Sequence, residues 1–263
     1  MSQIVGVDVG GTFTDLIFLD DKTGEVRIAK VPSTPENQAF GVLDALSKSD
    51  VLLPEVNTII HGTTVTTNAI LERKIAPCGL ITTRGFRDSL ELGRRTRPKP
   101  YGLIGSFECL IPRDLRFEVT ERMDSKGKAL EDLNEDEVIA AARKLIDAGV
   151  ESVVIHFLHS YINDEHERQA ETIIEKIWPN SFITRGSAIM AEYREYERGT
   201  TAMINAAVQP VLDRYIKKLQ NELQSGGYPR DLLVMQGNGG TVSSKIIAET
   251  SVNTVMSGPA SGV

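Results

Sequence analysis

The stretch VDVGGTFTD, residues 7–15, joins two apolar runs near the amino terminus and carries acids, glycines and hydroxyls where a plain hairpin needs only a turn. Strand alternation places Val5, Val7 and Val9 on one face, so Asp8 points away from them at the strand end. A carboxylate beside a phosphate requires a divalent cation between them. Asp8 is therefore predicted to hold Mg²⁺, through water, next to a bound phosphate; a hairpin with an Asp-stabilised glycine turn is the alternative.

The turn itself supplies the predicted phosphate-binding groups. Gly10 and Gly11 allow a tight turn whose backbone N–H groups can approach an anion closely. Thr12 and Thr14 add hydroxyl donors. We expect these four residues to bind the cofactor.

The surrounding segments predict an antiparallel meander followed by parallel strands. The expected strands are 4–9, 13–19, 25–31, 58–62 and 77–82, with helices from Ser33 or Thr34 to about 47 and from 64 to 73. Strand and helix alternate again between 134 and 185, after an insertion at about 94–132. The fold class is thus α/β with a mixed sheet flanked by helices.

A long apolar stripe follows from Glu192, with Val208, Leu212 and Tyr215 among its members, and Pro210 is expected to kink or divide this helix. A strand at 232–235 then leads into a glycine-rich loop. We expect two domains: 1–188, and 189–263 as the start of a second lobe.

Composition excludes several classes of protein. The chain has 263 residues, 41% of them hydrophobic, and a net charge of −7, which argues against coating nucleic acid or an anionic membrane. Its cysteines, Cys78 and Cys109, are too few for a disulfide framework. No basic segment followed by a long apolar run opens the chain. A cytoplasmic protein is expected.

Two common nucleotide-binding signatures are missing: neither G-x-x-x-x-G-K-[ST] nor a G-x-G-x-x-G after a strand is present. An acid and a glycine pair within a meander resemble the first phosphate loop of the actin, heat-shock chaperone and sugar-kinase superfamily, which has a ribonuclease-H-like domain. An ordered series of further segments resembles the hydantoinase A and 5-oxoprolinase family. These segments are DVGGTFTD at 8–15, HGTTVTTNA at 61–69, TTRGFRD at 82–88, REYER at 194–198, QGNGG at 236–240 and SGPASGV at 257–263.

This resemblance implies an actin-like ATPase fold that uses ATP and Mg²⁺ to open a cyclic amide such as a hydantoin or oxoproline. The amide or imide oxygen would be phosphorylated, and water would then open the ring. A companion hydantoinase B-like subunit or domain is expected. Two alternatives remain: an ATP-binding subunit of an acetone- or acetophenone-type ketone carboxylase, and a non-catalytic, nucleotide-responsive assembly module.

The same segments supply further candidate residues. His61 could act as an acid or base, or it could belong to the cap of the next helix. Substrate candidates are Thr63, Thr64, Asn68, Asn238 and Gly239, with a hairpin turn as the alternative for the last two. Ser257 and Gly258 are candidates for a phosphate or adenosine contact, and Glu195 and Arg198 either face a cleft or form salt bridges.

Members of this family are typically more than twice as long as this chain, and their second phosphate loop lies beyond the matching part. We therefore expect an amino-terminal region with an incomplete second lobe, whose activity alone is in doubt.

Overall fold

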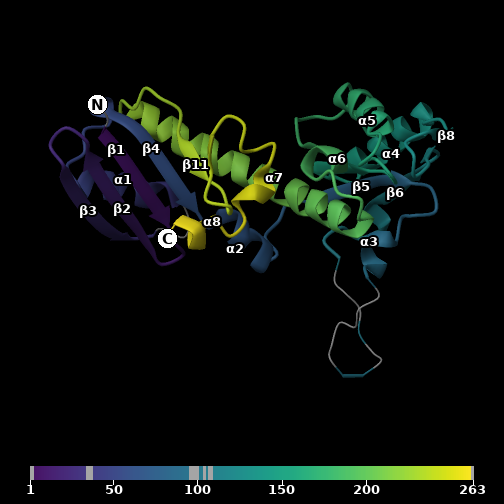
Figure 1. Cartoon of the computed structure of the whole chain (residues 1–263), viewed down its shortest axis with the longest axis horizontal. Helices are drawn as coiled ribbons and strands as arrows, with labels where there is room; N and C mark the ends of the chain where they lie inside the picture. The colour runs from purple at the N-terminus through teal and green to yellow at the C-terminus, as the bar shows by residue number, and fades with distance from the viewer. Residues whose placement is uncertain (1–2, 34–37, 95–100, 103–104, 106–108, 262–263) are drawn as a thin grey trace. The chain divides into compact units, whose positions relative to one another are not determined.

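The computed structural model describes residues 3–33, 38–94, 101–102, 105 and 109–261 (Figure 1). The chain divides into two compact units. The first combines Met1–Lys74 with Val211–Val263, and the second is Ile75–Pro210. This division differs from the expected boundary at 188, because the carboxyl-terminal segment adds its strands to the amino-terminal sheet.

A mixed sheet forms the first unit, in the order β12-β11-β4-β1-β2-β3. Its strands are β1 (Gln3–Val9), β2 (Phe13–Asp20), β3 (Glu25–Pro32), β4 (Val56–Thr63), β11 (Leu233–Met235) and β12 (Thr241–Ser243). The predicted meander of β1, β2 and β3 is confirmed, and β4 pairs parallel to β1 as expected. β11 lies parallel to β4 on its other side.

Helices cover one face of this sheet. Val5, Val7 and Val9 pack there against α1 (Gln38–Lys48) and the carboxyl half of α7 (Glu195–Ser225). The predicted apolar stripe of α7 is confirmed, since Leu212, Leu219 and Leu223 are buried in this core. Pro210 lies inside α7 without ending it. The expected start of α1 at Ser33 or Thr34 touches residues 34–37, which are outside the described residues.

The opposite face of the sheet carries Asp8 and stays exposed within the described residues. Ile17 and Ile28, cross-strand neighbours on this face, are 51% and 76% exposed. Asp8 therefore lies on the open side of the sheet, as strand alternation predicts.

The second unit contains a parallel sheet in the order β10-β9-β5-β6. Its strands are β5 (Cys78–Thr83), β6 (Arg116–Val119), β9 (Ser152–His156) and β10 (Ile183–Arg185); β7 (Arg122–Met123) and β8 (Ala129–Glu131) form a separate hairpin. β5 was expected beside the meander, and this was wrong: it pairs with β6 and β9. The predicted insertion at 94–132 lies partly outside the described residues and contributes β6, β7 and β8.

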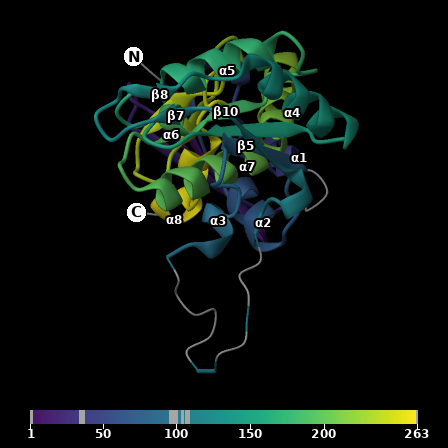
Figure 2. The same cartoon turned by 90° about the vertical axis from the view of Figure 1, so that its right-hand side faces the viewer.

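Helices cover both faces of this second sheet, as buried parallel strands require. Figure 2 shows α4 (Glu135–Asp147) and α5 (Glu165–Glu175) on one side of β5, and α3 (Ser89–Leu92) and α7 on the other. The remaining helices are η1 (Leu53–Glu55), α2 (Val65–Leu71), η2 (Arg113–Leu115), α6 (Gly186–Ile189), η3 (Ser251–Thr254) and α8 (Ser257–Ser261). None of the helices in the described part of the chain is both long and apolar enough to cross a membrane.

Candidate functional site

Most of the predicted site residues lie in the first unit, at the edge where β1, β4 and β11 end. These three strands run parallel, so the turns that follow them leave the sheet on the same side. In open sheets with parallel strands, ligands bind outside the carboxyl ends of the strands. This edge is therefore the place to look for a site.

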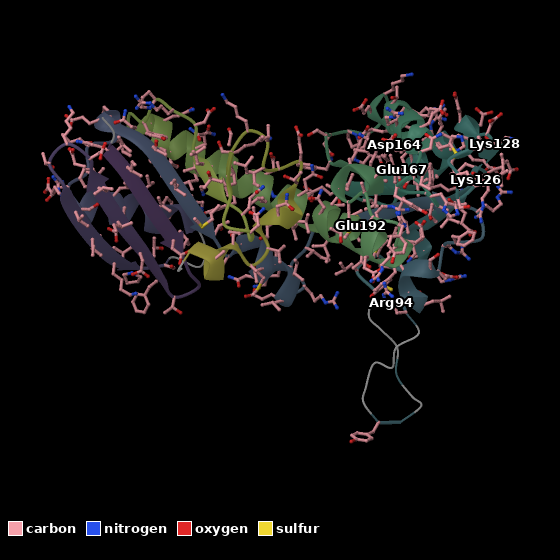
Figure 3. All side chains as sticks on the ribbon, in the orientation of Figure 1. Arg94, Lys126, Lys128, Asp164, Glu167 and Glu192 are labelled. Carbon is pink, nitrogen blue, oxygen red and sulfur yellow. The ribbon has the colours of Figure 1, made fainter. Side chains whose placement is uncertain are left out.

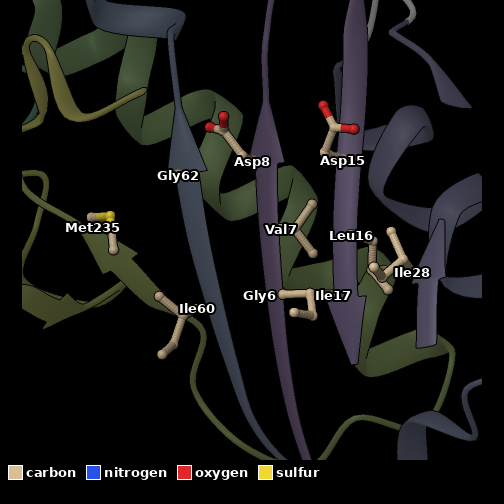
Figure 4. Close-up of a pocket in the computed structure, with 10 residues that line it drawn as sticks. All are labelled: Gly6, Val7, Asp8, Asp15, Leu16, Ile17, Ile28, Ile60, Gly62 and Met235. Carbon is tan, nitrogen blue, oxygen red and sulfur yellow. The ribbon is translucent and has the colours of Figure 1, made fainter. Parts of the chain in front are cut away.

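Asp8 lies on the open face beside a hollow of about 440 Å³. Its cross-strand neighbours are Asp15 on β2 and Gly62 on β4 (Figure 4). Gly62 has no side chain, so nothing from that position fills the space next to the Asp8 carboxylate. Asp15 is paired with Lys30, whose Nζ lies 2.8 Å and 3.0 Å from the two carboxylate oxygens.

The glycine turn between β1 and β2 is open on its outer side. The Gly10 N–H donates to Phe13 O over 3.0 Å, and a Cβ at Gly10 would lie only 3.1 Å from that oxygen. A Cβ at Gly11 would meet no atom within 4 Å. Gly11 and Thr12 are both exposed. The turn is thus accessible to an anion at the position that the sequence predicts.

Thr14 lies on the other face of the sheet from Asp8. It is 0% exposed, and its hydroxyl is hydrogen-bonded to Ser33 Oγ over 3.0 Å. Its hydroxyl is thus engaged within the core. The sequence did not predict this contact of Ser33 with the turn, because Ser-Thr-Pro-Glu at 33–36 is typical of a helix cap.

The turn after β4 brings several other predicted residues together. Thr64 Oγ1 donates to Val9 O over 3.2 Å and accepts from Asn68 Nδ2 over 3.2 Å. Ser257 Oγ donates to Thr63 O over 2.9 Å, although Ser257 is 194 residues further along the chain. A Cβ at Gly258 would lie 2.8 Å from Thr64 Cγ2, so only glycine allows α8 to approach so closely. Thr63 and Ser257 are both fully buried.

His61 does not share the face of Asp8. It pairs with Val7 in register, lies on the helix-covered face and is 0% exposed. Its Nε2 lies 2.9 Å from the hydroxyl of Tyr215 on α7. Burial lowers the pKa of His61 to about 3 and raises the pKa of Tyr215 above its usual value. The structure therefore places His61 as a neutral core residue, away from the open side where a substrate could enter. Sequence reasoning missed Tyr215, which it counted only as part of the apolar stripe.

This burial predicts a pH dependence of stability. In the unfolded chain a histidine binds its proton near pH 6.5, whereas folded His61 does so near 3. Between these values the unfolded state holds more protons, so the free energy of unfolding falls as the pH decreases. From pH 6.5 to pH 5 the loss due to His61 is expected to be about 2 kcal/mol.

Urea unfolding followed by circular dichroism at pH 7 and pH 5 checks this expectation. His61→Gln keeps a polar partner for Tyr215 but does not titrate. Between pH 7 and pH 5 its free energy of unfolding should therefore fall by about 2 kcal/mol less than that of the original chain. Equal pH dependence in the variant and the original chain would contradict the assignment.

Asn238 and Gly239 form the exposed turn between β11 and β12, which was the alternative considered for them. Gly239 has φ +83°, and Asn238 Oδ1 accepts from Gly240 N over 2.9 Å. The Gly237 N–H donates to Asn253 O over 2.7 Å. The turn follows β11 at the same sheet edge as Thr63, but its described hydrogen bonds are not to the other predicted residues.

Asp8 and the open glycine turn fit the donor set of a magnesium-bound phosphate ester. No group of three or more histidine, cysteine, aspartate or glutamate side chains with metal-binding geometry occurs among the described residues. Mg²⁺ usually takes one or two carboxylates and completes its shell with water and substrate phosphates. Asp8 beside an open glycine turn matches that donor set.

Comparison with known proteins gives matches along nearly the whole chain. Residues 4–178 match the hydantoinase/oxoprolinase N-terminal region, and residues 198–263 match hydantoinase/oxoprolinase. An uncharacterized protein of Methanocaldococcus jannaschii is 39% identical over 100% of this chain and 39% of its own length. The caprolactamase subunit alpha of Pseudomonas jessenii is 33% identical over 98% of this chain and 38% of its own length.

Two solved structures are similar as well. The crystal structure of the ATP-dependent caprolactamase from Pseudomonas jessenii superposes with a TM-score of 0.85 at 32% identity, over 98% of this chain and 39% of that one. The nucleotide-free structure of an acetone carboxylase that carries out ATP-dependent acetone carboxylation gives 0.83 at 31% identity, with the same coverage. The chain thus spans less than half the length of these relatives.

Proposed function

Because the chain belongs to the hydantoinase/oxoprolinase family, we propose that it is the ATP-binding region of an enzyme that hydrolyses a cyclic amide. The observation that carries the proposal is the placement of Asp8 beside an open glycine turn at the edge of three parallel strands. The caprolactamase relative, described as ATP-dependent, supports both the nucleotide and the substrate class. We further propose that the first unit is the ribonuclease-H-like half of an actin-like ATPase fold.

Each residue at the edge has a distinct role in this proposal. The N–H groups of Gly11 and Thr12 bind phosphate oxygens, and the Thr12 hydroxyl adds a donor; the Gly10 N–H instead closes the turn by donating to Phe13 O. Asp8 holds Mg²⁺ through water, and the ion neutralises phosphate charge. Thr64 and Asn68 orient the turn after β4 toward the same edge.

The proposed chemistry is phosphoryl transfer followed by hydrolysis. The γ-phosphoryl group of ATP passes to the amide or imide oxygen, which makes the ring carbon electrophilic. ADP is released, water adds to that carbon, and the C–N bond breaks to give an acyl phosphate. A second water then hydrolyses the acyl phosphate to the carboxylate and inorganic phosphate. Phosphoryl transfer depends mainly on positioning and charge neutralisation, which backbone amides and one carboxylate can supply.

A ketone carboxylase subunit is the second candidate. The TM-score with acetone carboxylase, 0.83, is nearly equal to the 0.85 with caprolactamase, and this favours the second candidate. In that case ATP bound at the same site would activate a ketone for carbon–carbon bond formation. Under either reading we propose a companion hydantoinase B-like subunit or domain and a cytoplasmic location.

The test uses the full-length polypeptide that contains this chain, together with its companion, and measures ATP hydrolysis with Mg²⁺ present. Stimulation by hydantoin, oxoproline or caprolactam supports the hydrolase, whereas stimulation by acetone or acetophenone with bicarbonate supports the carboxylase. If neither set stimulates hydrolysis, the enzymatic proposal fails and a nucleotide-responsive assembly module is favoured.

A further inference from the structure

Ser33, which follows β3, makes two hydrogen bonds to the backbone of the glycine turn. Its Oγ donates to Gly10 O over 2.8 Å, and its backbone N–H donates to Thr12 O over 2.9 Å. One residue therefore holds carbonyl oxygens at both ends of the three-residue turn. It does so from outside the stretch that carries the sequence motif.

The direction of the hydroxyl protons follows from these contacts. A serine hydroxyl has one hydrogen, and that of Ser33 is given to Gly10 O. The 3.0 Å contact between Thr14 Oγ1 and Ser33 Oγ must then be donated by Thr14. The Thr14 hydroxyl thus donates to Ser33 Oγ, and the Ser33 hydroxyl donates to Gly10 O. We call this chain of two hydrogen bonds the turn relay.

Helix α1 holds the turn relay in place. Gly41 of α1 packs directly against Thr14, since a Cβ at Gly41 would lie only 2.7 Å from Thr14 Oγ1. The helix can approach so closely because Gly41 has no side chain. Thr14 is 0% exposed. Water therefore does not compete for its hydroxyl, and the hydrogen bond to Ser33 is the one described for that atom.

The relay fixes the orientation of the peptide between Gly10 and Gly11. In a planar trans peptide the C=O and the following N–H point in opposite directions. The Gly10 carbonyl is drawn toward the face covered by α1, where Thr14 is buried, so the Gly11 N–H is directed away from that face. That leaves the Gly11 N–H directed toward the side of the sheet that carries Asp8, where Gly11 is exposed.

We propose that Ser33 is a positioning residue for phosphate binding: it aims the Gly11 N–H at the anion and keeps the Gly10 carbonyl oxygen away from it. This inference rests on the proposed function, because it concerns the ATP site. A released carbonyl could turn toward the phosphate, and its partial negative charge would oppose binding. Thr14 supports Ser33 without contacting the ligand.

The test measures, by calorimetry, the affinity for ATP with Mg²⁺ of the full-length polypeptide that contains this chain. Ser33→Ala is expected to weaken binding about tenfold, since one backbone-orienting hydrogen bond is lost. Ser33→Thr keeps a hydroxyl and should restore most of the affinity. Ser49→Ala is the matched control: its hydroxyl also donates to backbone carbonyls in the first unit, at 2.8 Å to Ala45 O, but far from the turn in sequence.

A second readout separates positioning from loss of folding. The amide proton resonance of Gly11, observed by NMR, should shift on addition of ATP and Mg²⁺, and this shift should shrink in Ser33→Ala while circular dichroism stays unchanged. If Ser33→Ala does not fold, Thr14→Val tests the same relay and should weaken binding in the same direction.

The outcomes distinguish the two proposals. Full-length wild-type polypeptide that binds no ATP with Mg²⁺ overturns the proposed function and this inference with it. Wild-type binding that Ser33→Ala leaves unchanged, or that Ser33→Thr fails to restore, overturns the inference alone.

Discussion

Asp8→Ala is expected to weaken the binding of ATP in the presence of Mg²⁺ by roughly 10- to 100-fold, the range for loss of a charged hydrogen-bond acceptor. Asp8 lies at the end of β1 on the open face, beside Gly62 and the glycine turn. Without this carboxylate the metal–nucleotide complex keeps its backbone donors but loses its anionic anchor. Calorimetry with and without Mg²⁺ measures the difference.

The loss should depend on the metal. Binding of ATP without Mg²⁺ should not weaken and should become somewhat tighter, because the carboxylate then only repels the phosphates. Asp44→Asn is the matched control, since Asp44 is an acid of the same unit whose exposed ion pair with Lys48 spans 3.0 Å. Equal affinity of Asp8→Ala and wild-type chain in Mg²⁺ would remove Asp8 from the site.

Folding should survive this substitution. Asp8 and Asp15 are direct cross-strand neighbours on one face, and like charges in such positions destabilise a sheet. Removing the Asp8 carboxylate relieves this repulsion, and urea unfolding of the variant measures the net effect on stability. A residue whose removal harms binding but not stability is what a functional site requires.

Arg198→Ala is expected to lower the free energy of unfolding of the second unit by about 3–5 kcal/mol. Arg198 is 0% exposed, and its guanidinium donates to Glu192 O over 2.7 Å and to Phe157 O over 3.0 Å. It also pairs with the Glu195 carboxylate. Glu192 is labelled in Figure 3. Truncation leaves two carbonyl groups without this donor and the Glu195 carboxylate without its counter-charge, which costs far more than loss of an exposed pair.

Trp178 provides the measurement, because it is the one tryptophan of the sequence and is buried within the second unit. Its fluorescence during urea unfolding reports on that unit. Arg194→Ala is the matched control on the same segment, since Arg194 is exposed and contacts Tyr193 OH over 3.2 Å; its cost should stay below about 1 kcal/mol. A similarly small cost for Arg198→Ala would contradict the structural role.

Glu195 and Arg198 were expected either to face a cleft or to form salt bridges. Their contacts with each other and with the loop after β9 match the salt-bridge alternative. The sequence could not decide this, because the spacing of an acid and a base on a helix is the same in a cleft and in a buried ion pair.

Local patterns predicted the elements of the first unit well. Alternating valines with a glycine turn gave the meander and the side of Asp8, because a strand side chain can only point to one of two faces. The apolar stripe of α7 was predicted for the same kind of reason, with the helical period. It was harder to predict which strands pair with each other. β5 has the apolar character of any buried strand, and this character does not indicate which sheet the strand joins.

Site residues divided along the same line. Asp8, Gly10 and Gly11 could be proposed from the sequence because their chemistry is local to one turn, and their role stays a prediction. Thr14 and His61 have the right chemistry, but both lie on the helix-covered face, at 0% exposure. The contacts of Ser33 with the turn and of Tyr215 with His61 were missed because these partners are distant in sequence.

The sequence by itself therefore determined the family, the mixed α/β class and the turn with its acid, since all of these depend on residue order and short-range geometry. Only the tertiary structure decided the division into units and the return of β11 to β4. It also decided which hydroxyls and imidazoles face the open side. The reason is that burial and hydrogen-bond partners arise from contacts between distant segments, such as Ser257 with Thr63, whose specificity no local pattern records.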